Sequence, residues 1–165
     1  MIANGVATDS TAISKAIEAR SVPNGAVVLV GRVFLVSLFL ISAPSYFSAQ
    51  GIKYAASQGV PLASLAVPLS GLIALAASLS IVLGYRARLG AWLIVLFLIP
   101  VTFTMHKFWG VTDPTMAQMQ MINFMKNVEI IGGALLLSQF GAGPWSLDAR
   151  RLRRLQRVPP TGEIQ

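Results

Sequence analysis

Long apolar segments alternate with short polar ones along most of the chain. The apolar segments cover residues 25–44, 62–83, 89–105 and 121–140. A helix needs about 20 mostly apolar residues to cross a bilayer, and each segment is close to that length. None of them alternates apolar and polar residues, as a half-buried strand does. The pattern therefore predicts four membrane-spanning helices.

Short connections join the four segments, and each contains residues that end helices. Gly59 and Pro61 lie in the first connection, Gly84 lies in the second, and Gly110 and Pro114 lie in the third. Short links place consecutive helices side by side and antiparallel. We therefore predict an all-α membrane protein, built as a four-transmembrane-helix up-down-up-down bundle.

The basic residues of the loops lie mainly on one side of this predicted bundle. Nine of them lie in the N-terminal segment, the second connection and the C-terminal tail: Lys15, Arg20, Arg86, Arg88, Arg150, Arg151, Arg153, Arg154 and Arg157. The other two connections carry only Lys53 and Lys107. Because cytoplasmic loops are enriched in Lys and Arg, we predict that both termini are cytoplasmic. The organisation is then a cytoplasmic N-terminal segment (1–24), a transmembrane domain (25–140) and a basic cytoplasmic tail (141–165).

The composition supports a membrane protein and excludes several functional classes. The 165 residues are 55% hydrophobic and 12% charged, whereas soluble domains are about 25% charged. The formal net charge is +7, but the basic residues flank the apolar segments. They therefore indicate topology and contact with anionic lipid, and no nucleic-acid partner is expected. The absence of cysteine excludes a disulfide framework and thiolate metal sites.

The two ends of the chain carry weaker signals. Residues 9–17 have the capping residues and apolar spacing of a short helix. Residues 146–158 combine three leucines with five arginines. That stretch is either an interfacial helix on an anionic leaflet or a frayed basic tail. A long, partly acidic lead-in and Pro44 argue against a cleaved signal peptide.

Three ionisable residues lie inside the apolar segments, where charges are costly and usually functional or paired. They are Arg32, Lys126 and Glu129. Lys126 and Glu129 are three residues apart on one helix face, and Arg32 approaches the depth of Glu129 from the other side. The three could form a buried cluster that binds a polar head group, such as the carbonyls of a quinone. Alternatively, Arg32 snorkels to the interface and the Lys126–Glu129 pair only fixes helix register.

Further polar residues extend this candidate site toward the far end of the bundle. Gln120, Asn123 and Asn127 recur at helical spacing and form a polar stripe that should face the bundle or a partner chain. His106 and Trp109 follow the third segment. An apolar slot with a few polar contacts suits an amphipathic ring. His106 with nearby methionines could also bind Cu(I), but apolar packing explains the methionines better, and no metal is predicted.

The motifs of common enzyme chemistry are missing. The sequence has no Gly-rich phosphate loop, no HExxH motif and no paired carboxylates or nucleophile–base pair. The sequence therefore does not predict an enzyme that acts alone.

Several short motifs resemble the DoxX family of bacterial membrane proteins. Over roughly residues 26–148 they are 31–35 (GRVFL), 83–91 (LGYRARLGA), 105–109 (MHKFW), 118–127 (QMQMINFMKN) and 143–148 (GPWSLD). The resemblance implies a four-helix, multi-pass protein of the bacterial plasma (inner) membrane. Because DoxX relatives are associated with a thiosulfate:quinone oxidoreductase, it also implies a subunit of a membrane oxidoreductase complex, with quinone as the cofactor to test.

Three functions remain open from the sequence. The first is a quinone-linked or accessory subunit of a membrane oxidoreductase complex, with redox proteins as partners. The second is a non-catalytic membrane scaffold or assembly protein, whose Arg-rich tail docks a cytoplasmic partner. The third is a small transporter, which would have to form a homo-oligomer because four spans are few for a translocation path.

Overall fold

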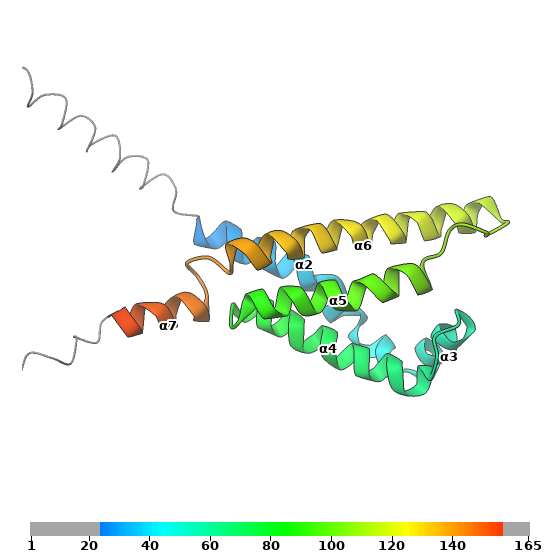
Figure 1. Ribbon diagram of the computed structural model, residues 1–165, viewed down its shortest axis with the longest axis horizontal. Coiled ribbons are helices and arrows are strands. Elements are labelled where there is room, and N and C mark those ends of the chain that lie inside the picture. Colours follow the sequence, from blue (N-terminus) through cyan, green and yellow to red (C-terminus); the bar gives the residue numbers. More distant parts are fainter. Residues whose placement is uncertain (1–23, 157–165) are drawn as a thin grey trace, which may run out of the picture.

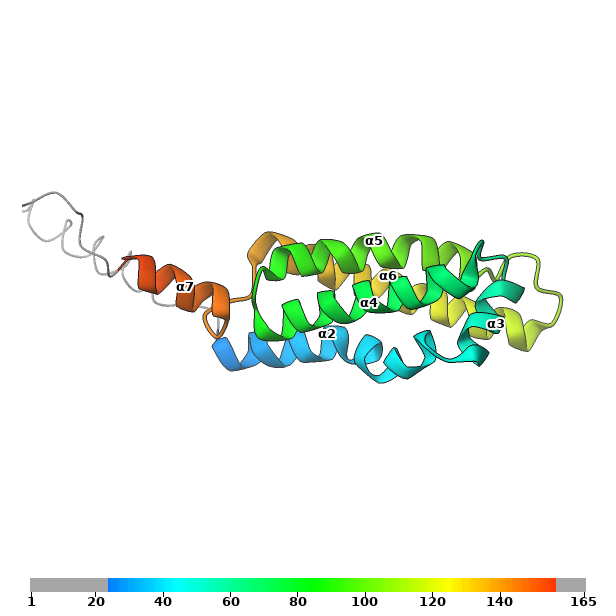
Figure 2. The same cartoon turned by 90° about the horizontal axis from the view of Figure 1, so that it is seen from below.

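The computed structural model describes residues 24–156, and six helices account for most of them. The helices are α2 (Gly25–Tyr46), α3 (Ala49–Ser57), α4 (Ala63–Leu83), α5 (Ala87–Met105), α6 (Pro114–Phe140) and α7 (Leu147–Gln156). Helices α2, α4, α5 and α6 lie side by side in an elongated bundle (Figures 1 and 2). The short helix α3 packs at one end, and α7 continues outward from the other.

The prediction of an all-α membrane protein is confirmed. Helices α2, α4 and α5 are each long and apolar enough to cross a membrane. Their outer faces carry exposed large side chains such as Phe34, Ile41 and Leu96. Such faces are stable in lipid, which solvates apolar side chains.

The prediction of four apolar spans needs a correction, because α6 does not meet the same criteria of length and composition. Helix α6 has 27 residues, so length is not the reason. Between residues 118 and 129 it carries six amide or charged side chains, which lower its hydropathy: Gln118, Gln120, Asn123, Lys126, Asn127 and Glu129. By composition alone, three spans are therefore established.

Most helix boundaries agree with the predicted segments, but two elements differ. Helix α6 begins at Pro114, seven residues before residue 121, because Asp113 caps it by accepting from Met116 N at 2.7 Å. Helix α3 was not predicted. Ser48 caps it, but its nine residues are too few and too polar to give an apolar segment. Of the two alternatives for the tail, a helix is present as α7. The helix predicted for residues 9–17 lies outside the described residues.

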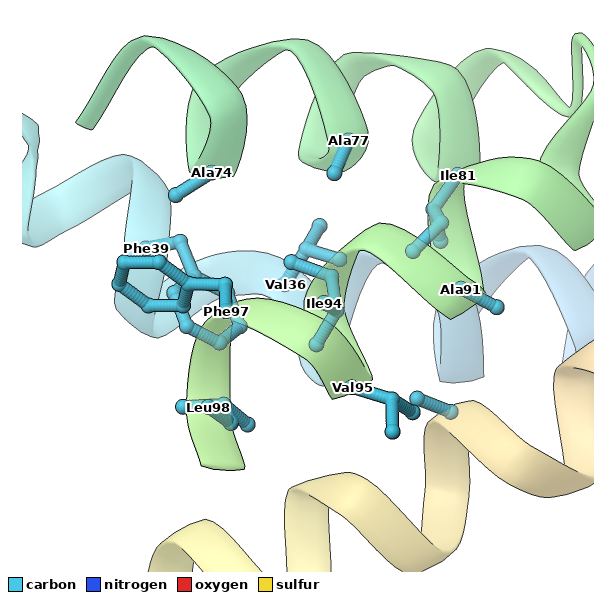
Figure 3. Packing of buried hydrophobic residues seen from close by; sticks show 11 residues of the cluster. Val36, Phe39, Ala74, Ala77, Ile81, Ala91, Ile94, Val95, Phe97 and Leu98 are labelled. Atoms are coloured by element: carbon cyan, nitrogen blue, oxygen red, sulfur yellow. The ribbon is translucent and has the colours of Figure 1, made fainter. Parts of the chain in front are cut away.

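Small residues let the helices approach closely around an apolar core. Helix α4 contributes Ala74, Ala77 and Ile81, which face Ile94 and other residues of α5 and α2 (Figure 3). Gly90 of α5 lies directly against the backbone of α4, where a Cβ atom would crowd the Ala77 carbonyl oxygen. Ala74 and Ser78 of α4, which are fully buried, serve the same close packing.

Candidate functional site

A cavity of about 800 Å³ lies at the end of the bundle that carries α3. We call it the α3-side cavity. All of α2 to α6 contribute to its wall, and most of the lining side chains are apolar. Ligand pockets commonly have about 300–1,000 Å³ and this mainly apolar character. The cavity is therefore large enough for a sizeable amphipathic molecule.

Aromatic side chains form the apolar floor of the α3-side cavity. Phe39 of α2 and Phe97 of α5 meet edge to face, with ring centroids 5.9 Å apart (Figure 3). Tyr46 packs edge to face on Phe97 at 6.2 Å and lies against Gly71, where a Cβ atom would clash with its ring. Edge-to-face pairs are favourable arrangements of aromatic quadrupoles. The floor therefore joins the ends of α2, α4 and α5.

Helix α6 supplies the polar wall of the same cavity. Asn127 is only 4% exposed, and its Nδ2 atom has no hydrogen-bond partner among the described residues. One turn earlier, Asn123 Oδ1 accepts a hydrogen bond from Lys126 Nζ at 2.8 Å. All three residues line the cavity. Because a buried amide without a partner costs about 1–3 kcal/mol, Asn127 marks a place where a ligand acceptor would be favourable.

His106 lies at the rim of the cavity and is held by α6. Its Nδ1 atom lies 3.0 Å from Oε1 of Gln120, and His106 itself lines the cavity. The Gln120 amide oxygen can only accept, so the geometry favours the tautomer with a proton on Nδ1. The other ring nitrogen, Nε2, is then an acceptor.

The structure gathers half of the predicted site residues in the α3-side cavity: His106, Asn123, Lys126 and Asn127. Gln120 supports them through His106. Trp109 belongs instead to an aromatic cluster with Phe103, Phe108 and Phe124. Glu129 is exposed, and no ion pair joins it to Lys126 among the described residues, where Lys126 donates to Asn123.

Sequence reasoning missed the other polar residues of the cavity. They come from α2 to α5: Ser42, Ser45, Tyr46, Tyr54, Ser70 and Thr104. Several of these hydroxyls already donate to carbonyls of their own helix, as Ser70 does to Val67 O at 2.8 Å. These residues line the cavity together with α3, which closes one side of it. The apolar pattern of the sequence did not predict α3. Tyr54 had the clearest signal, as an aromatic residue in a supposed loop.

Arg32 lies at the opposite end of the bundle, so the expected approach of Arg32 to Glu129 is not found. Arg32 is 3% exposed, and its guanidinium donates to Ile81 O at 3.3 Å and to Trp145 O. Gly84 gives it room, because any Cβ atom there would meet Arg32 Nη1. Arg32 therefore ties α2 to the end of α4 and to the segment before α7.

Asp148 completes this junction from the first turn of α7. Its carboxylate accepts hydrogen bonds from Arg86 N at 2.9 Å and Ala87 N at 3.2 Å, the free N–H groups at the start of α5. Its own N–H donates to Gly84 O at 2.9 Å. A carboxylate at this position replaces the side-chain cap that Arg86 cannot supply, as its own side chain makes no cap hydrogen bond. The junction thus fixes where α7 leaves the bundle.

Comparison with known proteins assigns the family. The model of the SURF4 family matches residues 11–153, which is most of the chain. The chain belongs to the SURF4 family. It is 34% identical over 125 residues to the inner membrane protein YphA of Escherichia coli (strain K12), a match that covers 74% of this chain and 89% of YphA.

A second relative is much longer. The chain is 27% identical over 124 residues to a Surfeit locus protein 4 homolog of Schizosaccharomyces pombe. That match covers 74% of this chain but only 37% of the yeast protein. No solved structure matches the chain.

These findings correct the resemblance to the DoxX family. The SURF4 match spans the same motifs and extends on both sides of them. Each DoxX-like motif is only 5 to 10 residues long, whereas the SURF4 match covers residues 11–153, so the longer match decides the family. The expected location is confirmed: with its apolar helices and its similarity to YphA, this SURF4-family protein is a multi-pass protein of the bacterial inner membrane.

Proposed function

We propose that this SURF4-family protein binds an amphipathic, membrane-soluble molecule in the α3-side cavity. The observation that carries the proposal is the unpartnered Nδ2 of Asn127, buried in the wall of a large and mainly apolar cavity. Such a combination favours a ligand with an apolar body and a hydrogen-bond acceptor at one end.

The donors of α6 limit the chemistry of the ligand head group. Asn127 Nδ2 can only donate, and Lys126 brings a positive charge to the same wall. A carbonyl, ether, carboxylate or phosphate oxygen satisfies both. A quinone ring carries such carbonyls and remains one member of this class. A role in an oxidoreductase complex is a separate question, since its support came from the DoxX resemblance.

The test compares two single substitutions on α6. Asn127→Leu removes the donor from the cavity, whereas Gln139→Leu replaces an exposed amide with leucine outside the cavity, near the other end of the helix. Each protein is purified gently from its own membrane, and bound membrane-soluble molecules are quantified by liquid chromatography and mass spectrometry. We expect a species enriched with the unmodified protein and with Gln139→Leu, and reduced on the order of tenfold with Asn127→Leu.

A stability measurement accompanies the binding measurement. Because Asn127 Nδ2 is buried without a partner, replacing it with leucine should leave the ligand-free protein at least as stable. Loss of ligand without loss of stability supports a binding role. Equal occupancy in all three proteins contradicts the proposal, and so does co-purification of no species other than bulk lipid. Titration with a short-tailed ubiquinone asks separately whether quinones belong to the ligand class.

We also propose that α6 crosses the membrane as a fourth span, which puts both termini on the same side. That side is the cytoplasm, because it carries most of the basic loop residues. The support is its position: α6 packs along α5, and Figures 1 and 2 show it running beside α5 in the bundle. At about 1.5 Å per residue, its 27 residues are long enough. A helix packed along a transmembrane neighbour lies in the same bilayer. Within the protein, α6 has Asn127 buried and Asn123 half-buried.

The absence of cysteine makes this proposal directly testable. Single cysteines are introduced at Thr112, between α5 and α6, and at Gln156, the last residue of α7. An impermeant maleimide is applied to intact and then permeabilised cells. Four spans require labelling of Thr112→Cys from outside and of Gln156→Cys only after permeabilisation. Labelling of both from outside would mean that α6 does not cross.

A further inference from the structure

A second groove lies at the α7 end of the bundle, away from the α3-side cavity. It has a volume of about 690 Å³ and is formed by the start of α5, the segment after α6 and one face of α7. We call it the α7-side groove. Figure 1 shows that these three segments meet where α7 leaves the bundle. Two of the sequence motifs, 83–91 and 143–148, contribute to its wall, but the proposed function does not use this groove.

The α7-side groove gathers positive charge that the described residues do not balance. Arg86 and Arg88 line it from the α5 side, and Arg151 lines it from α7. The one carboxylate in its wall, Asp148, already accepts hydrogen bonds from the Arg86 and Ala87 backbone. No ion pair involves the three arginines in residues 24–156. Guanidinium groups are well suited to phosphate, because their planar donors match its oxygens.

Apolar side chains lie next to these arginines. Leu89 of α5, Phe140 at the end of α6 and Leu152 of α7 line the same groove, and Phe140 is 81% exposed. A free phosphate or an acidic peptide would leave these apolar side chains uncovered. A phospholipid presents phosphate and acyl chain side by side at the edge of the bilayer. On the topology proposed above, on which this inference rests, α5 begins and α6 ends at the cytoplasmic edge.

We infer that the α7-side groove is a binding site for an anionic phospholipid of the cytoplasmic leaflet. Its phosphate pairs with Arg88 and Arg151, and its acyl chains pass along Leu89 and Phe140. Basic pockets at the cytoplasmic ends of helices commonly hold such head groups. The site is more specific than attraction of the whole tail. Helix α7 continues outward rather than across the bundle end (Figures 1 and 2), and Arg150 and Arg154 are outside the groove lining.

The decisive experiment compares two variants of equal charge. R88Q/R151Q removes two arginines that line the groove, whereas R150Q/R154Q removes two arginines of α7 that do not line it. The intact protein is placed in nanodiscs with equal amounts of phosphatidylglycerol and phosphatidylcholine, and retained lipid is counted by native mass spectrometry. We expect preferential retention of phosphatidylglycerol by the unmodified protein and by R150Q/R154Q. We expect a loss on the order of tenfold in R88Q/R151Q.

Two further arms keep the result interpretable. Because Arg151 lies on α7, outside the bundle, R151Q alone reports on the site even if R88Q impairs folding, and it should show a partial loss. Soluble glycerol phosphate, added in excess, should not displace the lipid. Equal loss in both double variants would mean diffuse charge attraction, and displacement by glycerol phosphate would mean a soluble anion site. Either outcome overturns the inference, and neither bears on ligand binding at Asn127.

Discussion

Gly84 controls how tightly the α7 end of the bundle can close, and replacing it with alanine should destabilise the protein. The residue has φ +64 and ψ +35, a left-handed conformation that costs an L-residue about 1–2 kcal/mol. In addition, a Cβ atom at Gly84 would meet Arg32 Nη1 and Cβ of Ser146. Both neighbours are fixed, because Arg32 is hydrogen-bonded to two carbonyls and Ser146 OH donates to Gly143 O.

The expected loss of stability in Gly84→Ala has two parts, which a control variant can separate. Overpacking a rigid site by one carbon costs about 1–3 kcal/mol, in addition to the backbone term. Gly110→Ala is the matched control, since Gly110 also has a positive φ, of +90, but a Cβ atom there would meet nothing within 4 Å. Gly84→Ala should therefore cost about 2–5 kcal/mol, and Gly110→Ala about 1–2 kcal/mol.

The assay is thermal unfolding of the purified proteins in one detergent, followed by tryptophan fluorescence. At about 2–4 °C per kcal/mol for a chain of this size, Gly84→Ala should melt roughly 2–12 °C below Gly110→Ala. The close approach of Arg32 is responsible for the difference. Equal melting temperatures for the two variants would refute this account of the junction.

Two further predictions concern the ends of the bundle. Asp148→Ala should destabilise the protein by about 1 kcal/mol, because two N–H groups at the start of α5 lose their acceptor. Asp148→Asn keeps one acceptor oxygen and should lose less stability. Identical melting temperatures for the two variants would contradict a capping role. Phe124→Ala should cost about 1–3 kcal/mol, because the half-buried Phe124 meets Phe103, Phe108 and Trp109 edge to face. It should also shift the Trp109 emission to longer wavelength, measured with Trp92 and Trp145 replaced by phenylalanine. Unchanged emission would mean that this cluster does not shield Trp109.

The family assignment shows where short motifs fail as a guide to function. Five motifs in a fixed order resembled DoxX, yet the match over residues 11–153 is to SURF4. The motifs cover only part of that range, and the amino-acid pattern of a membrane helix is dominated by the need to be apolar, so a local match carries little information. A match over most of the chain also includes the residues between the motifs.

The candidate site was predictable in part. The polar stripe of α6 was visible because polar residues are costly inside an apolar segment. Helical geometry also separates Asn127 from Glu129, since residues two positions apart in a helix point about 200° apart around its axis. Which of the two is buried depends on what packs against α6. Helix α5 and the cavity lie on the side of Asn127 and leave Glu129 exposed.

The sequence by itself determined the three apolar helices, because the length of an apolar run is a local property, and Gly84 directly after α4 marks the end of that helix. Only the tertiary structure decided which polar groups meet. Arg32 binds carbonyl oxygens 49 and 113 residues away, and Asp148 caps a helix that begins 61 residues earlier. Such contacts depend on how helices pack and where chain segments return. A hydropathy pattern gives no information on helix packing or on contacts between distant segments, because it records only whether each residue prefers water or lipid.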